Sequence, residues 1–232
     1  MSQGKRDRDR TKKRGGRASA DVRHAQILSE AAAFFSEHGF AAQTRALAEN
    51  SGIAQRQLYR HFPSKGALID EVYDREILGP FKAAWLAMLG DRSRPAEQRL
   101  HDFYLDYFTA VLTRKWLRLF LFASLGGTAV APDYIQSTIK RLLHTLVEEV
   151  AAEKRVALPA DETLIHEIGW VLHGAVSHLA IRRHIYGADD RLPVAPVLAL
   201  QIRSFLDGFE SAVRMARSMP TTSVESSIDD NR

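Results

Sequence analysis

Polar side chains that can contact nucleic acid are concentrated between residues 44 and 65 of this 232-residue chain. This stretch carries amide, guanidinium and phenol groups at Gln55, Arg56, Gln57, Tyr59 and Arg60. Groups of this kind hydrogen-bond to base edges or hold phosphate oxygens. There is no acidic residue between Ser51 and Lys65, although ordinary exposed helices usually include some. The residue types therefore favour a surface that meets a polyanion.

Two short helices joined by a tight turn would hold these side chains. The sequence predicts helices over about 44–51 and 55–61, with Gly52 in the turn and the small residue Ala48 at the helix crossing. The apolar side chains expected to fill the shared core are Leu47, Ile53 and Leu58. This spacing is typical of a helix-turn-helix, whose second helix enters the major groove of DNA.

The rest of the chain also has a helical period. The first helix is indicated by apolar residues at helical spacing, namely Ile27, Leu28, Ala31, Phe34 and Phe35. Gly39 is expected to end that helix, and Ser64 to cap a fourth helix that begins near Lys65. Later helices are predicted over about 81–89, 95–113, 115–124, 132–155, 161–186 and 195–217. No stretch alternates with a strand period, so we expect an all-α fold.

Residues 25–73 resemble the TetR family of bacterial transcriptional repressors. The resemblance rests on Ile27-Leu28 through Phe34-Phe35, the Gly39-Phe40 turn, Leu47-Ala48-Glu49 with Gly52-Ile53, and the run from Leu58 through Tyr59-Arg60-His61-Phe62-Pro63-Ser64-Lys65 to Ala67-Leu68. It implies an N-terminal three-helix DNA-binding domain and a larger helical domain for ligand binding and dimerisation.

The resemblance also implies which side chains contact DNA. Phosphate contacts fall on Thr44 and His61. Contacts to bases or the adjoining backbone fall on Arg45, Gln55, Gln57, Tyr59 and Arg60. Lys65 is a further phosphate contact, because it lies at the positive end of the fourth helix. Arg56 is also a candidate, with its role open. Other roles are open too: Thr44 can cap its helix, and Tyr59 and His61 can pack against the first helix.

Two positions depart from the family pattern. The spacing from Gly39 to Leu47 is one residue shorter than usual, which affects where the second helix begins. Ala54 stands where a serine or threonine commonly caps the recognition helix. The missing cap costs about 1 kcal/mol.

Positive charge is concentrated at the N-terminus, where residues 1–24 hold nine Lys or Arg and three Asp. We expect a basic disordered arm over 1–20, a helix-turn-helix domain over 21–73, a helical ligand-binding and dimerisation domain over 74–217, and a disordered tail over 218–232. The arm would contact DNA phosphates. The alternative is an all-α ligand-binding or lipid-surface protein whose arm binds an anionic membrane.

Aromatic residues are unusually frequent in 73–122, which holds ten of the twenty in the chain. They can fill a helical core or line a small-molecule pocket. Our candidates for a ligand pocket, which would suit an apolar or aromatic effector, are Trp85, Phe108, Trp116, Phe120, Trp170 and His173.

The last two long helices carry apolar faces suited to pairing between two copies. A homodimer interface is predicted at His166, Gly169, Leu198, Ile202, Phe205 and Phe209. The alternative is that these side chains belong to the core of a single chain.

Several other classes of protein are disfavoured. The chain has no cysteine, and no apolar run approaches the ~18 residues of a membrane span. We therefore expect a cytoplasmic protein that joins the nucleoid when bound to DNA. The histidines of 161–186 lack the spacing of metal ligands, and no nucleotide-binding or catalytic motif is present. We expect no metal, no cofactor and no enzymatic activity. The predicted function is that of a repressor which a small molecule releases from a double-stranded DNA operator.

Overall fold

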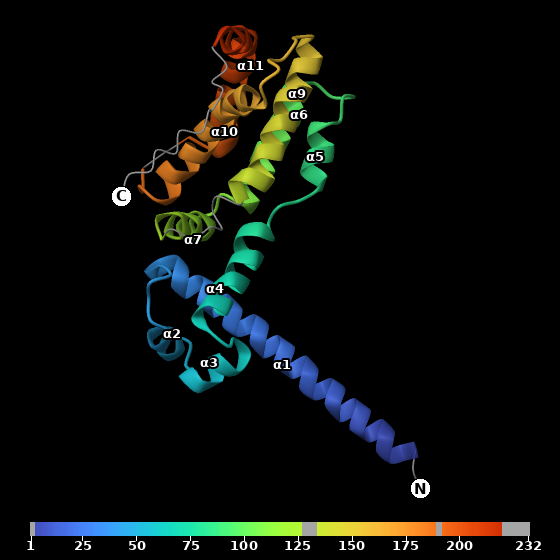
Figure 1. Ribbon diagram of the computed structural model, residues 1–232, viewed down its shortest axis with the longest axis vertical. Helices are drawn as coiled ribbons and strands as arrows, with labels where there is room; N and C mark the ends of the chain where they lie inside the picture. Colours follow the sequence, from blue (N-terminus) through green and yellow to red (C-terminus); the bar gives the residue numbers. More distant parts are fainter. Residues whose placement is uncertain (1–2, 127–133, 189–191, 220–232) are drawn as a thin grey trace, which may run out of the picture. The chain divides into compact units, whose positions relative to one another are not determined.

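The computed structural model describes residues 3–126, 134–188 and 192–219. Within these ranges every regular element is helical (Figure 1). The expected all-α fold is confirmed. No helix in the described part of the chain is both long and apolar enough to cross a membrane.

The chain folds into two compact units. The first contains α1 (Gln3–His38), α2 (Thr44–Asn50), α3 (Gln55–His61), α4 (Lys65–Tyr73), the π-helical turn η1 (Asp74–Leu78) and α7 (Arg114–Leu125). The second contains α5 (Ala84–Leu89), most of α6 (Ala96–Ala110), nearly all of η2 (Ile135–Ile139), α9 (Lys140–Lys154), α10 (Glu162–His184) up to residue 183, and α11 (Val194–Ser218). These helices agree with the predicted ones to within a few residues, apart from α1, the short α5 and the π-helical start of the segment predicted over 132–155.

Helix α1 differs from the expected arm, because it already begins at Gln3 rather than after residue 20 (Figure 1). The segment up to residue 20 contains no proline and is rich in lysine and arginine, which are good helix formers. It therefore continues the helix that the apolar residues from Ile27 onward establish. The expected tail over 218–232 lies outside the described residues beyond Met219.

The first unit is built on the apolar face of α1. Its buried side chains include Ile27, Leu28, Ala31, Phe34 and Phe35 from α1, Leu47 and Ala48 from α2, Leu58 from α3, and Leu68 and Val72 from α4. Ser64 caps α4 as predicted, with its Oγ atom accepting a hydrogen bond from the Ala67 amide at 3.0 Å. The core thus fixes α2, α3 and α4 to one another and to α1.

The first unit also includes α7, which the predicted boundary at residues 73 and 74 had assigned to the larger domain. The guanidinium of Arg118 donates to the backbone carbonyls of Ser36 and Glu37 at the end of α1. Lys115 forms an ion pair with Glu76 of η1 at 2.5 Å. These polar contacts bind α7 to α1 and η1, although they leave no signal in the hydrophobic periodicity.

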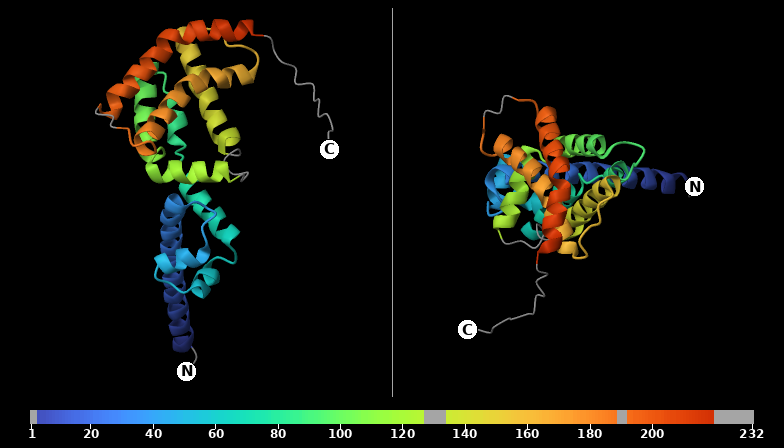
Figure 2. Two further views of the ribbon diagram at one scale, coloured as in Figure 1. Left: turned by 90° about the vertical axis from the view of Figure 1, so that its left-hand side faces the viewer. Right: turned by 90° about the horizontal axis from the view of Figure 1, so that it is seen from above.

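The second unit buries the apolar faces of its long helices within the chain itself. In both views of Figure 2, α10 (orange) and α11 (red) lie beside one another, and the Gln201 amide donates to the Ala175 carbonyl at 3.2 Å. The apolar residues predicted to form a dimer interface on α11 are all buried here, namely Leu198, Ile202, Phe205 and Phe209. They are core side chains of a single chain, and this assignment is corrected.

The two predicted interface residues on α10 face α9 instead. A β-carbon at Gly169 would lie 2.8 Å from the Leu143 β-carbon, so the absence of a side chain lets α9 and α10 approach closely. The ring centroid of His166 lies 6.0 Å from that of His144, which is on α9. Apolar periodicity correctly located the buried faces, but it did not indicate that they are covered by the same chain.

Candidate nucleic-acid interface

The turn between α2 and α3 has the geometry that the sequence predicts. Gly52 has a φ of +62°, which favours glycine, although a β-carbon there would meet no atom within 4 Å. The Ile53 amide donates to the Ala48 carbonyl at 3.0 Å. The backbone conformation, and not lack of space, therefore accounts for the glycine that sets the angle between α2 and α3.

Helix α3 presents a polar face without acidic residues. Gln55, Arg56, Tyr59 and Arg60 are exposed, and Gln57 is half-buried. On the opposite side Leu58 is buried in the core of the unit. Amide and guanidinium groups on an exposed helix can bond to the acceptor and donor edges of bases in a major groove. The structure thus places these five predicted side chains on the outer part of one short helix.

Thr44 has a different environment from the one predicted. Its hydroxyl lies 2.9 Å from the Tyr59 hydroxyl and accepts a bond from the Gln55 amide at 3.2 Å. The residue is only 7% exposed, and the N-cap position of α2 belongs to Gln43. Thr44 therefore does not cap its helix. It links the start of α2 to two residues of α3, and so it helps to orient their side chains.

Arg45 is exposed at the surface, and Lys65 is half-buried. The Arg45 guanidinium pairs with Glu49 one helical turn away at 3.0 Å, and both side chains are largely exposed. Such exposed pairs contribute little to stability, so a phosphate can displace the glutamate. Lys65 is the first residue of α4, and the amides of that turn add positive potential beside it.

His61 packs against the first helix, which is the alternative that the sequence analysis left open for this residue. Its ring centroid is 5.9 Å from that of His24, and its buried Nε2 atom has no hydrogen-bond partner among the described residues. Burial, followed by the charges of His24, Arg60 and Arg23, lowers the pKa of His61. A neutral ring is a weaker phosphate ligand than the predicted contact requires.

A polar cluster at this junction was missed by the sequence reasoning. The His24 Nε2 atom lies 2.6 Å from a carboxylate oxygen of Glu71, which joins α1 to α4. The His24 ring also packs on Phe62, at 4.4 Å between centroids. His24 is four residues before Leu28, so its place on the buried face of α1 could have been read from the helical period.

Ala54 is the N-cap residue of α3, and no side chain caps that helix. The sequence predicted this missing cap. The backbone amide of Gln57 already donates to the Ala54 carbonyl at 2.8 Å, so the backbone amides of Gln55 and Arg56 are those that a DNA phosphate or solvent can meet at this end of α3.

The six residues predicted to line a ligand pocket are divided between the two units. In the first unit Trp116 stacks on Phe120, with centroids 4.8 Å apart. The four in the second unit are Trp85, Phe108, Trp170 and His173. There the Tyr104 hydroxyl lies 3.4 Å from His173 Nδ1, and burial lowers the pKa of His173 to about 4. A single pocket lined by all six residues stays a prediction.

Residues 27–72 match the model of the bacterial regulatory proteins of the tetR family. A 90-residue stretch is 34% identical to the HTH-type transcriptional repressor KstR2 of Mycobacterium tuberculosis, and it covers 38% of this chain and 44% of that repressor. The chain thus spans less than half the length of the curated relative that it matches.

Solved structures extend the similarity of fold over most of the chain. A TetR-like transcriptional regulator from Rhodococcus sp. RHA1 superposes with a TM-score of 0.60 at 22% identity, and covers 82% of this chain and 96% of its own. A transcriptional regulator of Aquifex aeolicus VF5 gives a TM-score of 0.53 at 16% identity, with 80% and 98% covered. The resemblance expected from residues 25–73 is confirmed, because residues 27–72 match the tetR family model, and the solved structures show a similar fold over most of the chain.

Proposed function

We propose that this protein is a transcriptional regulator that binds a double-stranded DNA operator through α3. The observation that carries the proposal is the polar, acid-free face of α3, which the Gly52 turn and the Thr44 hydrogen bonds hold in place. A helix displayed in this way can place amides and guanidinium groups against base edges. Because the similar KstR2 is a repressor, we propose repression as the outcome of binding.

The basic start of α1 would add contacts that do not depend on base sequence. Residues 1–24 carry nine Lys or Arg, and each contact with a phosphate releases counterions. An anionic membrane could attract the same charges. The side-chain amides of Gln55 and Gln57 on α3 favour DNA as the partner, since binding to a membrane surface does not require them.

We further propose that two copies pair through the exposed sides of α10 and α11. Val171 on α10 and Leu200 and Met215 on α11 are 60%, 67% and 61% exposed, although all three are large and apolar. These positions replace the buried residues that the sequence analysis had assigned. Pairing would present two copies of α3, as reading two half-sites requires.

Small-molecule control is the remaining part of the proposal. A ligand that binds one conformation more tightly than the other shifts the population toward it, and so can release the operator. The aromatic side chains around Trp116 and around His173 support an apolar or aromatic effector.

The experiment is a selection of tight-binding DNA from a random pool, followed by titrations of the selected duplex and of a scrambled duplex. Arg60→Ala should weaken binding to the selected duplex by about 5- to 150-fold, because a base contact is worth roughly 1–3 kcal/mol. Arg214→Ala is the matched control, since it removes an exposed arginine from α11.

The selection also discriminates between the two candidate functions. Failure to enrich any sequence, together with binding to vesicles that contain anionic lipid, would favour the membrane alternative. An equal loss for both duplexes with Arg60→Ala would mean that Arg60 contacts only phosphate.

A further inference from the structure

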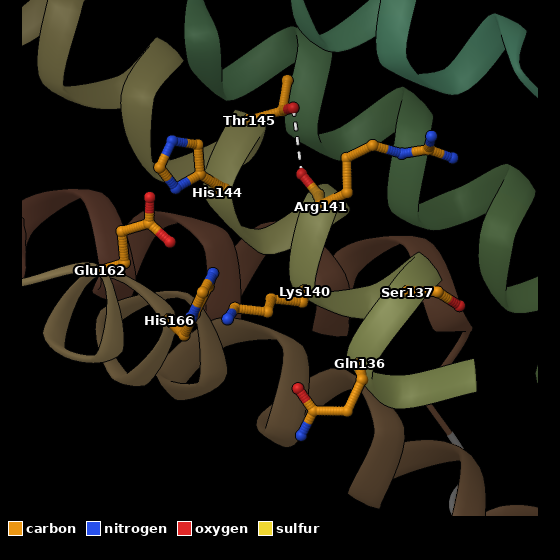
Figure 3. A pocket seen from close by; sticks show the side chains of 8 residues that line it. All are labelled: Gln136, Ser137, Lys140, Arg141, His144, Thr145, Glu162 and His166. Atoms are coloured by element: carbon orange, nitrogen blue, oxygen red, sulfur yellow. Dashed lines mark hydrogen bonds between the residues drawn. The ribbon is translucent and has the colours of Figure 1, made fainter. Parts of the chain in front are cut away.

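A polar cavity of about 310 Å³ lies between the first turns of α9 and α10, beside η2 (Figure 3). All of the residues that line it belong to the second unit. Ligand pockets have volumes of roughly 300–1,000 Å³, so this one suits a compact molecule. It contains none of the aromatic side chains considered above for an effector.

Four of the side chains that line this cavity can carry positive charge, namely Lys140, Arg141, His144 and His166. In Figure 3 the Lys140 side chain extends toward His166, and the His144 ring lies on the other side of Glu162. The two imidazole centroids are 6.0 Å apart. The guanidinium of Arg141 extends away from these groups in the same view, so Arg141 adds charge only from a distance.

At His166, the effect of Lys140 exceeds that of either Glu162 or Glu167. Among the described residues, no carboxylate forms an ion pair with the Lys140 ammonium, whereas His144 lies 3.2 Å from Glu148. The pKa of His166 is lowered by burial and then by Lys140 and His144. Glu162 and Glu167 oppose this shift with smaller effects. An anion placed beside His166 and Lys140 would therefore be attracted.

The hydrogen-bonding groups present here also suit an oxyanion. The ammonium and the two imidazoles are donors, and the Gln136 amide also lines the cavity, whereas the Ser137 hydroxyl extends away from them in Figure 3. Such donors form their strongest bonds with carboxylate and phosphate oxygens. Within the described part of the chain, no three histidine or acidic side chains are arranged to hold a metal ion.

We propose that this cavity binds a small oxyanion, a molecule that carries a carboxylate or phosphate group, through Lys140, His144 and His166. Lys140 supplies fixed charge, and the two imidazoles supply N–H donors from opposite helices. Glu162 limits the affinity by its own negative charge. The proposal does not depend on DNA binding, and it is tested without DNA.

The test is calorimetric titration of the full chain with inorganic phosphate and, separately, with citrate, at constant ionic strength. Saturable binding of at least one probe is expected. Lys140→Gln should weaken it about tenfold or more, as loss of a charged hydrogen bond does. Glu162→Gln should strengthen it several-fold. A structural defect would not change the affinities of these two variants in opposite directions.

Lys154→Gln is the matched control, because Lys154 ends the same helix about 20 Å away along its axis. This variant should bind the probes within twofold of the unaltered chain. Equal weakening by Lys140→Gln and Lys154→Gln would overturn the proposal, because it would indicate a general charge effect. Absence of saturable binding to both probes would also overturn it. If only one probe binds, it identifies the oxyanion as phosphate or carboxylate.

The affinity should also depend on pH. The pKa of His166 is lowered, so its protonation adds charge mainly below about pH 6.5, and binding relative to the His166→Gln variant should tighten as the pH falls from about 6.5 to 5. The carboxylates near the two rings are those of Glu148, which pairs with His144, and of Glu162 and Glu167, which oppose the lowering of the His166 pKa. His166→Gln should flatten the pH profile, and an unchanged profile in that variant would contradict the role of His166.

Discussion

Thr44 joins the two short helices of the first unit through a single hydroxyl group. Its Oγ1 atom contacts the Tyr59 hydroxyl at 2.9 Å and the Gln55 amide at 3.2 Å. Both partners lie on the exposed face of α3, where their rotamers would otherwise be free. A side chain that fixes the rotamers of neighbouring residues lowers the entropy lost when those residues bind.

Replacing Thr44 with valine tests this role, because valine keeps the shape and removes the hydroxyl. Operator affinity should fall by about fivefold, which corresponds to a net hydrogen-bond contribution of about 1 kcal/mol. Thr44→Ser should restore most of the affinity. Fluorescence anisotropy with the selected duplex is the measurement. A serine variant as weak as valine would indicate that the methyl group matters instead.

His173 is a buried titratable group whose pKa shift links stability to pH. Burial lowers its pKa to about 4, whereas an exposed histidine titrates near 6.5. The unfolded chain therefore binds the proton more tightly than the folded chain does. The free energy of unfolding is unaffected by this group above about pH 6.5, and it decreases as the pH falls from there toward 4.

Urea unfolding at pH 7 and pH 4.5 should show this loss, with a contribution from His173 of up to about 3 kcal/mol. The variant His173→Gln cannot titrate and should lose less stability over the same interval. Some dependence on pH should persist, because the pKa of His61 is lowered in the same sense. His178→Gln, on the exposed side of α10, is the control. If His173→Gln lost as much unfolding free energy between pH 7 and pH 4.5 as the unaltered chain does, His173 would not be the source of this loss.

Helix α7 closes the C-terminal end of α1, although 75 residues separate the two helices in the chain. Arg118 donates to the carbonyls of Ser36 and Glu37, which have no acceptor role within α1. Its guanidinium also lies 5.3 Å from the centroid of the Phe122 ring. That ring in turn would lie 3.3 Å from a β-carbon at Gly39. The left-handed residue that ends α1 is thus covered by α7.

Arg118→Ala should lower the free energy of unfolding by about 1–3 kcal/mol, because charged hydrogen bonds to two carbonyls are lost. Arg118→Lys should recover only part of this, since an ammonium lacks the planar fork. Arg203→Ala serves as the comparison, because the ion pairs of Arg203 with Glu97 and Asp207 are exposed and their loss should change stability much less. Equal losses from Arg118→Ala and Arg203→Ala would argue against a capping role.

At the scale of the whole molecule, the proposed pairing of two copies depends on the apolar side chains that a single chain leaves exposed. Phe209 is fully buried in the second unit, whereas Leu200, on another side of the same helix, is 67% exposed. A charge at these two positions should therefore have different consequences. One position belongs to the fold and the other to the proposed pairing of two copies.

Leu200→Asp should yield a folded monomer with nearly unchanged helix content, while Phe209→Asp should unfold the second unit by burying an unpaired charge. Sedimentation equilibrium and circular dichroism distinguish these results. The Leu200 variant should also bind the operator more weakly, because the two half-sites are no longer read together. A Leu200→Asp protein that stays dimeric would place the interface elsewhere.

Local patterns in the sequence were sufficient to predict most of the helices and their ends. The glycines at 39 and 52 both adopt positive φ, and Ser64 forms the predicted cap. Helix formation, capping and turns depend on residues within about four positions of one another, so a single sequence carries their signals. The polar residues on the outer face of α3 could be predicted for the same reason.

Contacts between distant segments were decided only by the tertiary structure. Apolar periodicity showed that Phe205 and Phe209 are buried, but not that the covering side chains come from the same chain. It gave no sign that Arg118 would reach the end of α1, or that His166 would face Lys140 across a cavity. A helical period specifies which face of a helix is apolar and leaves open what packs on it, because packing partners are selected by three-dimensional shape and charge and not by spacing along the chain.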